Sequence, residues 1–500
     1  MGILSELEPK AVFKYFEEIC DIPHGSADTK RISDYCVNFA KEHGLKYIQD
    51  ESNNVMIFKN GTKGYENSKP VIIQGHLDMV CEKESGCDID FTKEGLRLGI
   101  CDGFIYAAGT TLGGDDGIAI AYALAILASH EIEHPPIEAV FTVDEEIGML
   151  GAAVIDCSDL KADTMLNIDS EEEGYLLVSC AGGVTATCHL PIMYEKMDYD
   201  ESQNANSNFD GSMVKILVSG LEGGHSGTEI DKGRANANQI LGRILYGLKK
   251  YIHFNLIDIY GGLKDNAIPR EANAEILLYS DNEHDVQQVR NKVNEIIDEY
   301  NKILKNEYRQ TDSNINITIQ DIERNCNVFS RESTDKVITA LVNLPCGIYK
   351  MSSDIEGLVQ TSLNLGILKI VNQEVIFSFS VRSSIKSEKD ELVSRMECLM
   401  EALSGYVTKV GEYPAWEYKN DSRLRGIMVK VYEKQYGKKP VIQAIHAGVE
   451  CGLFAGKIEG LDCVSFGPDI LDIHTPKERL NIDSVERVWK YLIEVLKQLR

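Results

Sequence analysis

The first third of the chain alternates between short apolar runs and longer segments in which apolar residues recur every three to four positions. A recurrence of about 3.6 residues predicts helices, and short runs rich in Val, Ile and Phe predict buried strands. The predicted helices cover residues 8–20, 28–44 and 117–129, and the predicted strands cover residues 55–59, 71–75, 137–143 and 164–168. Strands that alternate with helices at this spacing predict an α/β fold with a mostly parallel, helix-covered sheet.

The pattern changes near residues 180–183. A polar, Asn- and Ser-rich hinge at 201–211 joins two strands, and the segments that follow suit an antiparallel sheet with helices on one face. The predicted strands here cover residues 214–218, 274–279, 315–324 and 374–381, and the predicted helices cover residues 234–251 and 283–305. From about residue 387 the α/β character returns, with helices at 389–403 and 424–436 and a strand at 462–466.

This change of pattern predicts two domains. Residues 1–184 and 387–500 form one discontinuous domain, and residues 185–386 form a smaller α+β domain inserted into it. A chain of 500 residues with 43% hydrophobic residues is long enough for both cores.

The charge and the cysteines narrow the classes of function. The formal net charge is −27, from 78 Asp and Glu against 51 Lys and Arg, and this argues against nucleic acid and against an anionic membrane surface as partners. The first residues lack the basic and apolar regions of a signal peptide, and no apolar run approaches the roughly 20 residues that span a bilayer. The 13 cysteines contain no CxxC pair and are typical of reduced, buried thiols. We therefore expect a soluble, cytoplasmic protein.

Acidic residues and an imidazole follow three of the predicted strands. His76 and Asp78 come after the strand at 71–75, Glu145 and Glu146 after the next strand, and Asp169 after the fourth. The carboxyl ends of parallel strands form one edge of a sheet, where α/β proteins place their sites. His and carboxylate together form a ligand mixture that divalent metals prefer.

Two further residues come from outside these strands. Asp115 follows Gly113 and Gly114 at the start of a predicted helix, and His474 lies in a loop that Pro476 restrains. Asp115 alone would be interpreted as a helix N-cap, and the HxD pair of His76 and Asp78 alone is usually incidental.

As a set, these residues predict two divalent cations that share one carboxylate. One cation would be held by His76, Asp115 and Asp169, and the other by Asp115, Glu146 and His474. Such pairs activate a bridging water for hydrolysis. Asp78 would orient His76 from behind, and Glu145 stays unliganded beside Glu146, as a general base must.

The segment from His130 to His134 matches a second metal signature, H-E-x-x-H. That signature needs a helix to hold both histidines, and Pro135 and Pro136 follow at once. We therefore expect the frayed end of a helix here and disfavour a single-zinc protease.

Seven motifs together resemble one known family. They are HLDMV at 76–80, GTTLGGD at 109–115, VDEE at 143–146, DSEE at 169–172, GGHSG at 223–227, NAIPREA at 266–272 and HAGVECG at 446–452. In this order they are similar to the aminoacyl-histidine dipeptidases of the carnosinase/aminoacylase superfamily of metallopeptidases. The resemblance spans nearly the whole chain and implies a di-zinc peptidase-like catalytic domain with an inserted lid and dimerisation domain.

The resemblance also implies roles for individual residues. His76, Asp115, Glu146, Asp169 and His474 fall on metal-ligand positions, Asp78 on the orienting aspartate and Glu145 on the proton shuttle. His225 falls on a histidine that polarises the scissile carbonyl, lent by the partner subunit in dimeric relatives, and Asn266, Arg382 and Glu450 fall among substrate-binding positions. From the residues alone, the segment at 223–227 reads as a turn and Arg382 as a surface charge.

One departure concerns Asp116, where the resemblance leads us to expect asparagine in many relatives. Zinc is the expected metal. Because an added carboxylate beside Asp115 can alter the metal preference, manganese and cobalt are the alternatives.

The predicted function is hydrolysis of dipeptides, Xaa-His or carnosine-like, by a water that bridges two divalent metals, with Glu145 as general base and then acid. The expected assembly is a homodimer. The alternatives are a tripeptidase or an N-acyl-amino-acid deacylase of the same superfamily, a catalytically silent peptide- or metal-binding homologue, and a di-metal phosphoesterase. The last is disfavoured because no phosphate-cradling motif is present in the sequence.

Overall fold

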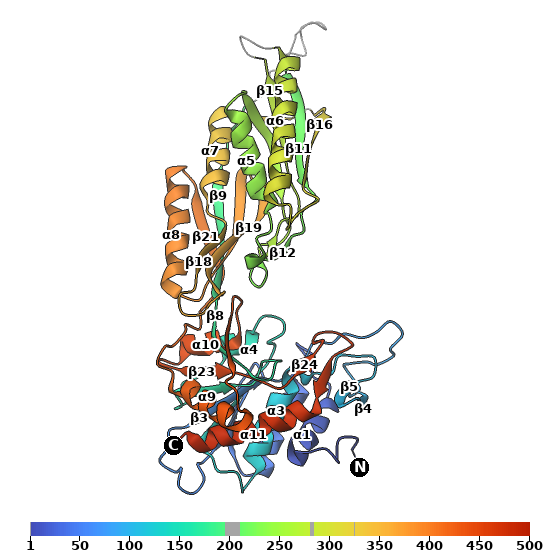
Figure 1. Ribbon diagram of the computed structural model, residues 1–500, viewed down its shortest axis with the longest axis vertical. Helices are drawn as coiled ribbons and strands as arrows, with labels where there is room; N and C mark the ends of the chain where they lie inside the picture. Colours follow the sequence, from blue (N-terminus) through green and yellow to red (C-terminus); the bar gives the residue numbers. More distant parts are fainter. Residues whose placement is uncertain (1, 196–210, 281–284, 325) are drawn as a thin grey trace. The chain divides into compact units, whose positions relative to one another are not determined.

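The computed structural model describes residues 2–195, 211–280, 285–324 and 326–500, which form two compact units (Figure 1). Unit 1 comprises Met1–Cys180, Pro414–Ile445 and Val449–Arg500, and unit 2 comprises Ala181–Tyr413 and His446–Gly448. The predicted hinge at 201–211 lies, apart from its last residue, outside the described residues. The domain limits inferred from the sequence stay a prediction.

Unit 1 is built on an eight-stranded sheet. In spatial order its strands are β1 (Lys46–Gln49), β2 (Val55–Lys59), β6 (Ile137–Thr142), β3 (Val71–His76), β7 (Thr164–Asn167), β23 (Asp462–Ser465), β8 (Tyr175–Cys180) and β22 (Val441–Ile445). The central neighbours β6, β3, β7 and β23 run parallel, while β1 and β2 add an antiparallel edge. The predicted α/β fold with a mostly parallel sheet is confirmed.

Helices cover this sheet. They are α1 (Lys10–Cys20), α2 (Lys30–Glu42), α3 (Gly114–Ala128), α4 (Leu150–Val154), α9 (Arg423–Tyr436), α10 (Glu450–Lys457) and α11 (Ile482–Gln498). From Gly114 to Leu127 every residue of α3 is buried, which explains why its sequence is apolar on all sides. On β3, Ile72 belongs to an apolar cluster with Cys451 and Phe454 of α10.

The contact between α3 and β3 depends on a glycine. A Cβ atom at Gly75 would lie 2.5 Å from Asp116 Oδ2 and 2.7 Å from the Cβ of Ala119. The missing side chain therefore lets the start of α3 approach the end of β3, and this brings Asp116 next to His76.

A small sheet restrains the segment that carries His474. It is made of β24 (Ile470–Leu471), β25 (Arg479–Asn481), β5 (Phe104–Ala107) and β4 (Leu98–Cys101), in that order. His474 lies in the connection between β24 and β25, which pair with each other. Pairing of β25 with β5 attaches this late segment to the early part of unit 1.

Unit 2 contains a nine-stranded antiparallel sheet. Its strands are β16 (Asn316–Ile322), β11 (Gly211–Ser219), β15 (Ala272–Tyr279), β13 (Phe254–Gly261), β19 (Val359–Val371), β20 (Glu374–Ser383), β9 (Gly182–Pro191) and β21 (Tyr406–Tyr413), with β18 (Gly347–Met351) paired to β19. Alternate residues of β11, namely Val214, Ile216 and Val218, join one apolar core with the helices of this unit. Those helices are α5 (Ala237–Lys249), α6 (Val286–Glu307), α7 (Arg331–Asn343) and α8 (Lys386–Ala402).

Short elements complete unit 2. A bridge-like pair joins β10 (Tyr194–Glu195) to β17 (Val328–Phe329), and another joins β12 (Gly224–His225) to β14 (Ala267–Ile268). Helix α8 and strand β21 belong to unit 2, where β21 pairs with β9. Among the described helices, none is long and apolar enough to cross a bilayer.

Candidate active site

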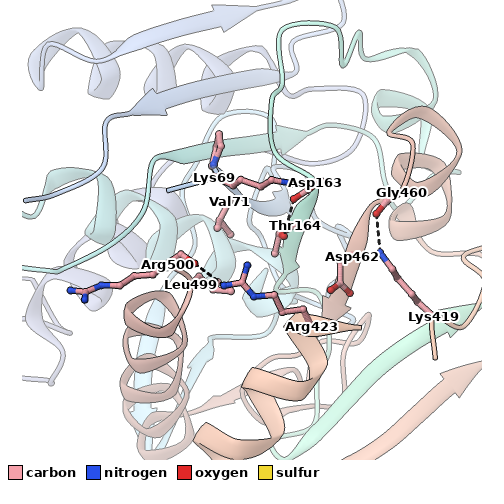
Figure 2. A pocket seen from close by; sticks show the side chains of 11 residues that line it. Lys69, Val71, Asp163, Thr164, Lys419, Arg423, Gly460, Asp462, Leu499 and Arg500 are labelled. Atoms are coloured by element: carbon pink, nitrogen blue, oxygen red, sulfur yellow. Dashed lines mark hydrogen bonds and ion pairs between the residues drawn. The ribbon is translucent and has the colours of Figure 1, made fainter. Parts of the chain in front are cut away.

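Two regions of unit 1 lie at opposite ends of its parallel strands. A pocket of about 230 Å³ lies at the amino-terminal ends, where Val71, Thr164 and Asp462 begin β3, β7 and β23 (Figure 2). Lys419 donates to the carbonyl of Gly460 at 3.0 Å and Arg423 to that of Arg500 at 2.7 Å, so both of these cationic side chains have partners in the pocket. This volume is below the 300–1,000 Å³ of typical ligand sites. The predicted metal ligands lie toward the carboxyl ends of these strands, where α/β sheets place their chemistry.

The strand register brings the carboxyl ends together. His76 on β3 pairs with Thr142 on β6, and Gln74 on β3 pairs with Asn167 on β7. Glu145 and Glu146 therefore leave the sheet on one side of His76, and Asp169 leaves it on the other.

His76 is 1% exposed and contacts carboxylates through both ring nitrogens. Its Nε2 lies 3.1 Å from Asp115 Oδ1 and 3.8 Å from Asp169 Oδ1. Its Nδ1 lies 2.9 Å from the carbonyl oxygen of Asp78, so an Nδ1–H donated there leaves the Nε2 lone pair free for a metal. Burial lowers the pKa of His76, but the nearby carboxylates of Asp115 and Asp78 raise it by more. The net result is a pKa well above the ordinary value. The surroundings of His76 thus favour positive charge.

Asp115 lies between two imidazoles. Its Oδ1 faces His76, and its Oδ2 lies 3.2 Å from Nε2 of His474, which is also 3.0 Å from Glu146 Oε1. The peptide bond between Asp115 and Asp116 is cis. One carboxylate that offers a separate oxygen to each of two histidines has the geometry of a bridging ligand.

The carboxylates at this site outnumber the positively charged groups that could balance their charge. The Oε1 atom of Glu146 is buried, and among the described residues it faces Nε2 of His474 at 3.0 Å without an aligned hydrogen bond. Burial, with nearby like charges, raises the pKa values of Asp116 and Asp169 well above the ordinary value. Buried carboxylates are stabilised when they are paired or coordinate metals, so this donor set fits divalent cations.

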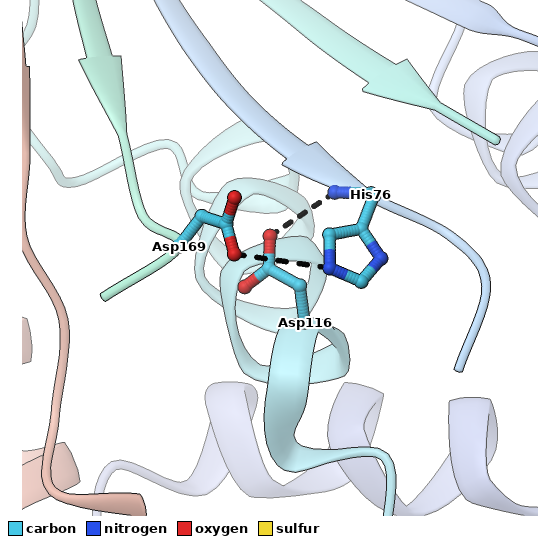
Figure 3. Close-up of side chains that lie close together, drawn as sticks. All are labelled: His76, Asp116 and Asp169. Atoms are coloured by element: carbon cyan, nitrogen blue, oxygen red, sulfur yellow. Dashed lines mark hydrogen bonds and ion pairs between the residues drawn. The ribbon is translucent and has the colours of Figure 1, made fainter. Parts of the chain in front are cut away.

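Among the residues that the structure describes, three groups of His and acidic side chains have ligand atoms within 4.8 Å of one another. They are His76 with Asp116 and Asp169, His76 with Glu145 and Glu146, and Asp115 with Glu146 and His474. The last group is the same as one predicted ligand set. The first group contains His76 and Asp169 of the other predicted set, with Asp116 in place of Asp115. Oδ2 of Asp116 accepts the backbone N–H of His76 at 3.0 Å (Figure 3).

Asp78 joins His76 to the turn that carries the glutamates. Its carboxylate accepts from the backbone N–H groups of Glu145 and Glu146 at 3.0 and 3.3 Å and from the hydroxyl of Ser26 at 2.8 Å. Burial raises the pKa of Asp78, but His76 and these donors lower it below its ordinary value. Asp78 is thus held as an anion behind His76.

Glu145 has a different environment from its neighbour. Burial raises its pKa to about 8; His76 opposes this shift, while Glu450, Glu146 and Asp115 add to it. A cation beside Glu145 would lower this pKa again. Such a carboxyl can exchange a proton near neutral pH, which general acid–base catalysis requires.

In unit 2, donors without partners converge on a glycine-rich loop. Arg382 donates from Nη1 to the hydroxyl of Tyr413 at 2.8 Å, while its buried Nε has no partner within the described part of the chain. The buried Oγ of Ser226 likewise has no hydrogen-bond partner among the described residues. A Cβ atom at Gly227 would lie 3.0 Å from Cε1 of His225 and 3.3 Å from Nε of Arg382, so this loop faces both side chains.

His446 adds a residue that the sequence did not single out. Its Nε2 lies 2.7 Å from the hydroxyl of Ser362, and burial, with the charges of Arg382 and His225, lowers its pKa to about 3. Asn266 is exposed, and its carbonyl accepts the backbone N–H of Ser226 at 2.9 Å. Neutral and cationic donors grouped in this way suit an anionic ligand group.

Comparison with known proteins places the chain in a family. Residues 72–498 match peptidase family M20/M25/M40. The chain belongs to this family. Over 499 residues it is 38% identical to the cytosol non-specific dipeptidase of Escherichia coli K12, with 100% of this chain and 99% of that protein covered. The predicted resemblance is therefore confirmed.

Solved structures show the same fold. Aminoacylhistidine dipeptidase from Vibrio alginolyticus is 36% identical to this M20/M25/M40 chain and matches it with a TM-score of 0.90, over 99% of this chain and 98% of the other. The aminopeptidase PepT from Bacillus cereus is 13% identical, with a TM-score of 0.53 over 99% of both chains. The second match shows the fold alone.

Buried polar residues beneath the ligands were missing from the sequence interpretation of this M20/M25/M40 chain. Gln74 donates to Glu450 Oε2 at 2.5 Å and accepts from Asn167 at 2.5 Å, and Thr142 donates to Glu450 at 2.7 Å. The sequence contains a signal for these residues, since the polar Gln74 and Asn167 interrupt apolar strands two positions before His76 and Asp169. Glu450 itself has no exposed surface, and its predicted contact with substrate stays a prediction.

The H-E-x-x-H segment is not helical, as expected from its prolines. Helix α3 ends at Ala128, and residues 129–136 contain no helical residue. His134 is buried, with Nδ1 2.7 Å from the carbonyl of Pro135. Within the described residues, neither His130 nor His134 belongs to a group able to hold a metal.

Proposed function

We propose that this chain hydrolyses dipeptides with two divalent cations in unit 1. His76, Asp115 and Asp169 would hold one cation, and Asp115, Glu146 and His474 would hold the other. The observation that carries the proposal is Asp115, which presents one oxygen to each imidazole. The names of the E. coli and Vibrio relatives, both dipeptidases, support the same reaction.

When bound, the cations would polarise the scissile carbonyl and lower the pKa of water. Glu145 takes the proton from the attacking water and passes it to the leaving amine, so that the peptide C–N bond breaks with no net change in protons. Asp78 keeps His76 oriented and holds the Glu145 backbone by its N–H group. His225 supplies a donor to the carbonyl oxygen.

The free carboxylate of the substrate would bind in unit 2. The unpartnered Nε of Arg382 and the neutral His446 offer donors there, beside Asn266. Recognition of a carboxylate by these donors requires an unblocked C-terminus on the substrate.

For the substrate class, we propose unblocked dipeptides, with Xaa-His and carnosine-like peptides among them. The relative from Vibrio is named for aminoacylhistidine and the relative from E. coli is named non-specific. We further propose zinc as the native metal, with manganese and cobalt as alternatives, a homodimeric assembly and a cytosolic location, as in the name of the E. coli relative.

A hydrolysis panel tests the proposal. Protein stripped by a chelator and reloaded with zinc, manganese or cobalt is given Xaa-His dipeptides, other dipeptides, a tripeptide and N-acetyl-histidine. We expect metal-dependent release of amino acids from the unblocked dipeptides. Cleavage of the tripeptide alone or of the acetylated substrate alone would favour the alternative peptidase or deacylase. Metal binding without any cleavage would favour a silent homologue.

A further inference from the structure

Four consecutive backbone N–H groups converge on the carboxylate of Glu478. Its Oε2 accepts from Leu112 at 2.8 Å and Gly113 at 3.2 Å, and its Oε1 accepts from Gly114 at 2.8 Å and Asp115 at 3.4 Å. The side chain of Glu478 is only 3% exposed. A buried carboxylate is thus satisfied entirely by the loop that ends in Asp115.

The loop is shaped to receive this carboxylate. Gly113, the residue before α3, has φ 66°, a left-handed value, and has no side chain that could accept the first N–H groups of the helix. A Cβ atom at Gly114 would lie 3.3 Å from Glu478 Oε1, so the glycine permits close approach. Glu478 therefore acts as the cap of α3 from a distant part of the chain, and a carboxylate at a helix N-terminus is electrostatically favourable.

Glu478 also belongs to the segment that carries His474. Its backbone N–H donates to the carbonyl of Thr475 at 3.0 Å, which closes a turn between the two residues. Immediately after Glu478, β25 pairs with β5. One side chain thus connects the loop of Asp115 to the loop of His474, although these two residues are 359 positions apart.

We propose that Glu478 is a positioning residue for the candidate metal centre. It holds the Asp115 backbone against the His474 turn, so that the Asp115 carboxylate faces His76 and His474 together. This inference rests on the proposed cation site. Among the described residues, Glu478 belongs to none of the groups whose atoms could hold a metal, so its effect passes through Asp115.

The test replaces the carboxylate by a group of the same size. In Glu478→Gln, one amide nitrogen would face two of the four N–H donors, and the loop would have to shift. A matched control is Glu138→Gln, because Glu138 is also buried in unit 1 and accepts from the backbone N–H groups of Lys161 and Ala162. Glu138 lies at the opposite end of β6 from the site.

The main readout is zinc content per chain over a series of buffered free-zinc concentrations, with thermal stability and kcat and KM measured alongside. We expect Glu478→Gln to need about 10–100-fold more free zinc for half-occupancy, the range found when partners of metal ligands are removed. At saturating zinc, kcat should return to within a few-fold of wild type, because Glu145 and all ligands are present. Glu138→Gln should lower stability and leave the zinc curve in place.

Identical zinc curves for Glu478→Gln and wild type would overturn the proposal, and so would an equal shift in Glu138→Gln. If Glu478→Gln is not recovered folded, Glu478→Asp takes its place, with a smaller shift expected and an unchanged curve again contradicting the role. Failure of the proposed function is distinguishable, because wild-type protein would then bind no zinc or cleave no dipeptide.

Discussion

At the residue scale, the candidate site is defined by the balance of charge around Asp115. Two imidazoles meet a larger number of carboxylates, and the pKa values of Asp116 and Asp169 rise as burial and like charge disfavour the anions. Divalent cations would reverse that penalty, which is the physical reason that ligands of this kind bind metal rather than one another.

Glu145→Gln separates catalysis from metal binding. The amide cannot carry a proton, but no predicted ligand is removed, so hydrolysis should fall by about 10²–10⁴-fold while zinc content stays at two per chain. Steady-state kinetics and elemental analysis of the same sample provide the measurement. A metal-replete variant with near-normal activity would contradict the role of Glu145.

The two imidazoles should serve different cations. His76→Ala and His474→Ala should each bind fewer than two cations per chain at low free metal, because each removes one nitrogen ligand from one site. Elemental analysis after dialysis against buffered zinc measures this. The control is His130→Ala, which should keep full metal occupancy. Metal loss in this control would support a metal site in the H-E-x-x-H segment.

At the scale of elements, three parallel strands are joined beneath the ligands. Gln74 of β3 and Thr142 of β6 both donate to Glu450 at the start of α10, and Asn167 of β7 donates to Gln74. Polar networks that are largely satisfied in a core restrict it to one arrangement, so the strand ends are held in one register. The close approach of α3 to β3 at Gly75 adds a second restraint.

Gly75→Ala should force α3 away from β3. The new Cβ would meet Asp116 Oδ2 at 2.5 Å and Ala119 at 2.7 Å, so we expect a loss of about 1–3 kcal/mol in the free energy of unfolding. The matched control is Gly426→Ala inside α9, where a Cβ would have no atom within 4 Å. This control should gain roughly 0.5–1 kcal/mol from helix propensity. Urea unfolding of both variants compares them, and equal effects would contradict the packing argument.

At the scale of the whole molecule, the residues proposed for chemistry are divided between two units. The proposed metal ligands and Glu145 lie in unit 1, while His225 and Arg382 lie in unit 2. The family resemblance predicts that His225 is lent by the partner subunit of a homodimer. The assembly is therefore a testable part of the proposed function.

Mixing two inactive chains tests this assembly. His225→Ala and Glu145→Gln chains, combined in equal amounts, should restore about a quarter of wild-type sites, because half of randomly formed dimers are mixed and one of their two sites is intact. Activity after proven subunit exchange is the measurement. A lack of recovery would mean that His225 acts within its own chain or not at all.

Much of the fold could be predicted from local patterns of apolar and polar residues. The predicted strand at 55–59 has the same bounds as β2, and helices such as α9 lie within one residue of the predicted range. The candidate ligands were also visible, because His76, Glu146 and Asp169 follow apolar strands and the sheet must bring such ends together. Periodicity and strand ends are local properties, so the sequence alone determined them, and with its motifs it determined the family.

Only the tertiary structure decided how Asp115 faces both imidazoles, how Glu478 caps the loop before it, and how Glu450 connects the strands. Glu478 and Leu112 are 366 positions apart, and Glu450 and Gln74 are 376 apart. A polar residue near a helix end or inside an apolar run has no local signature of its distant partner. Its role is set by packing, where burial forces each donor and acceptor to find one.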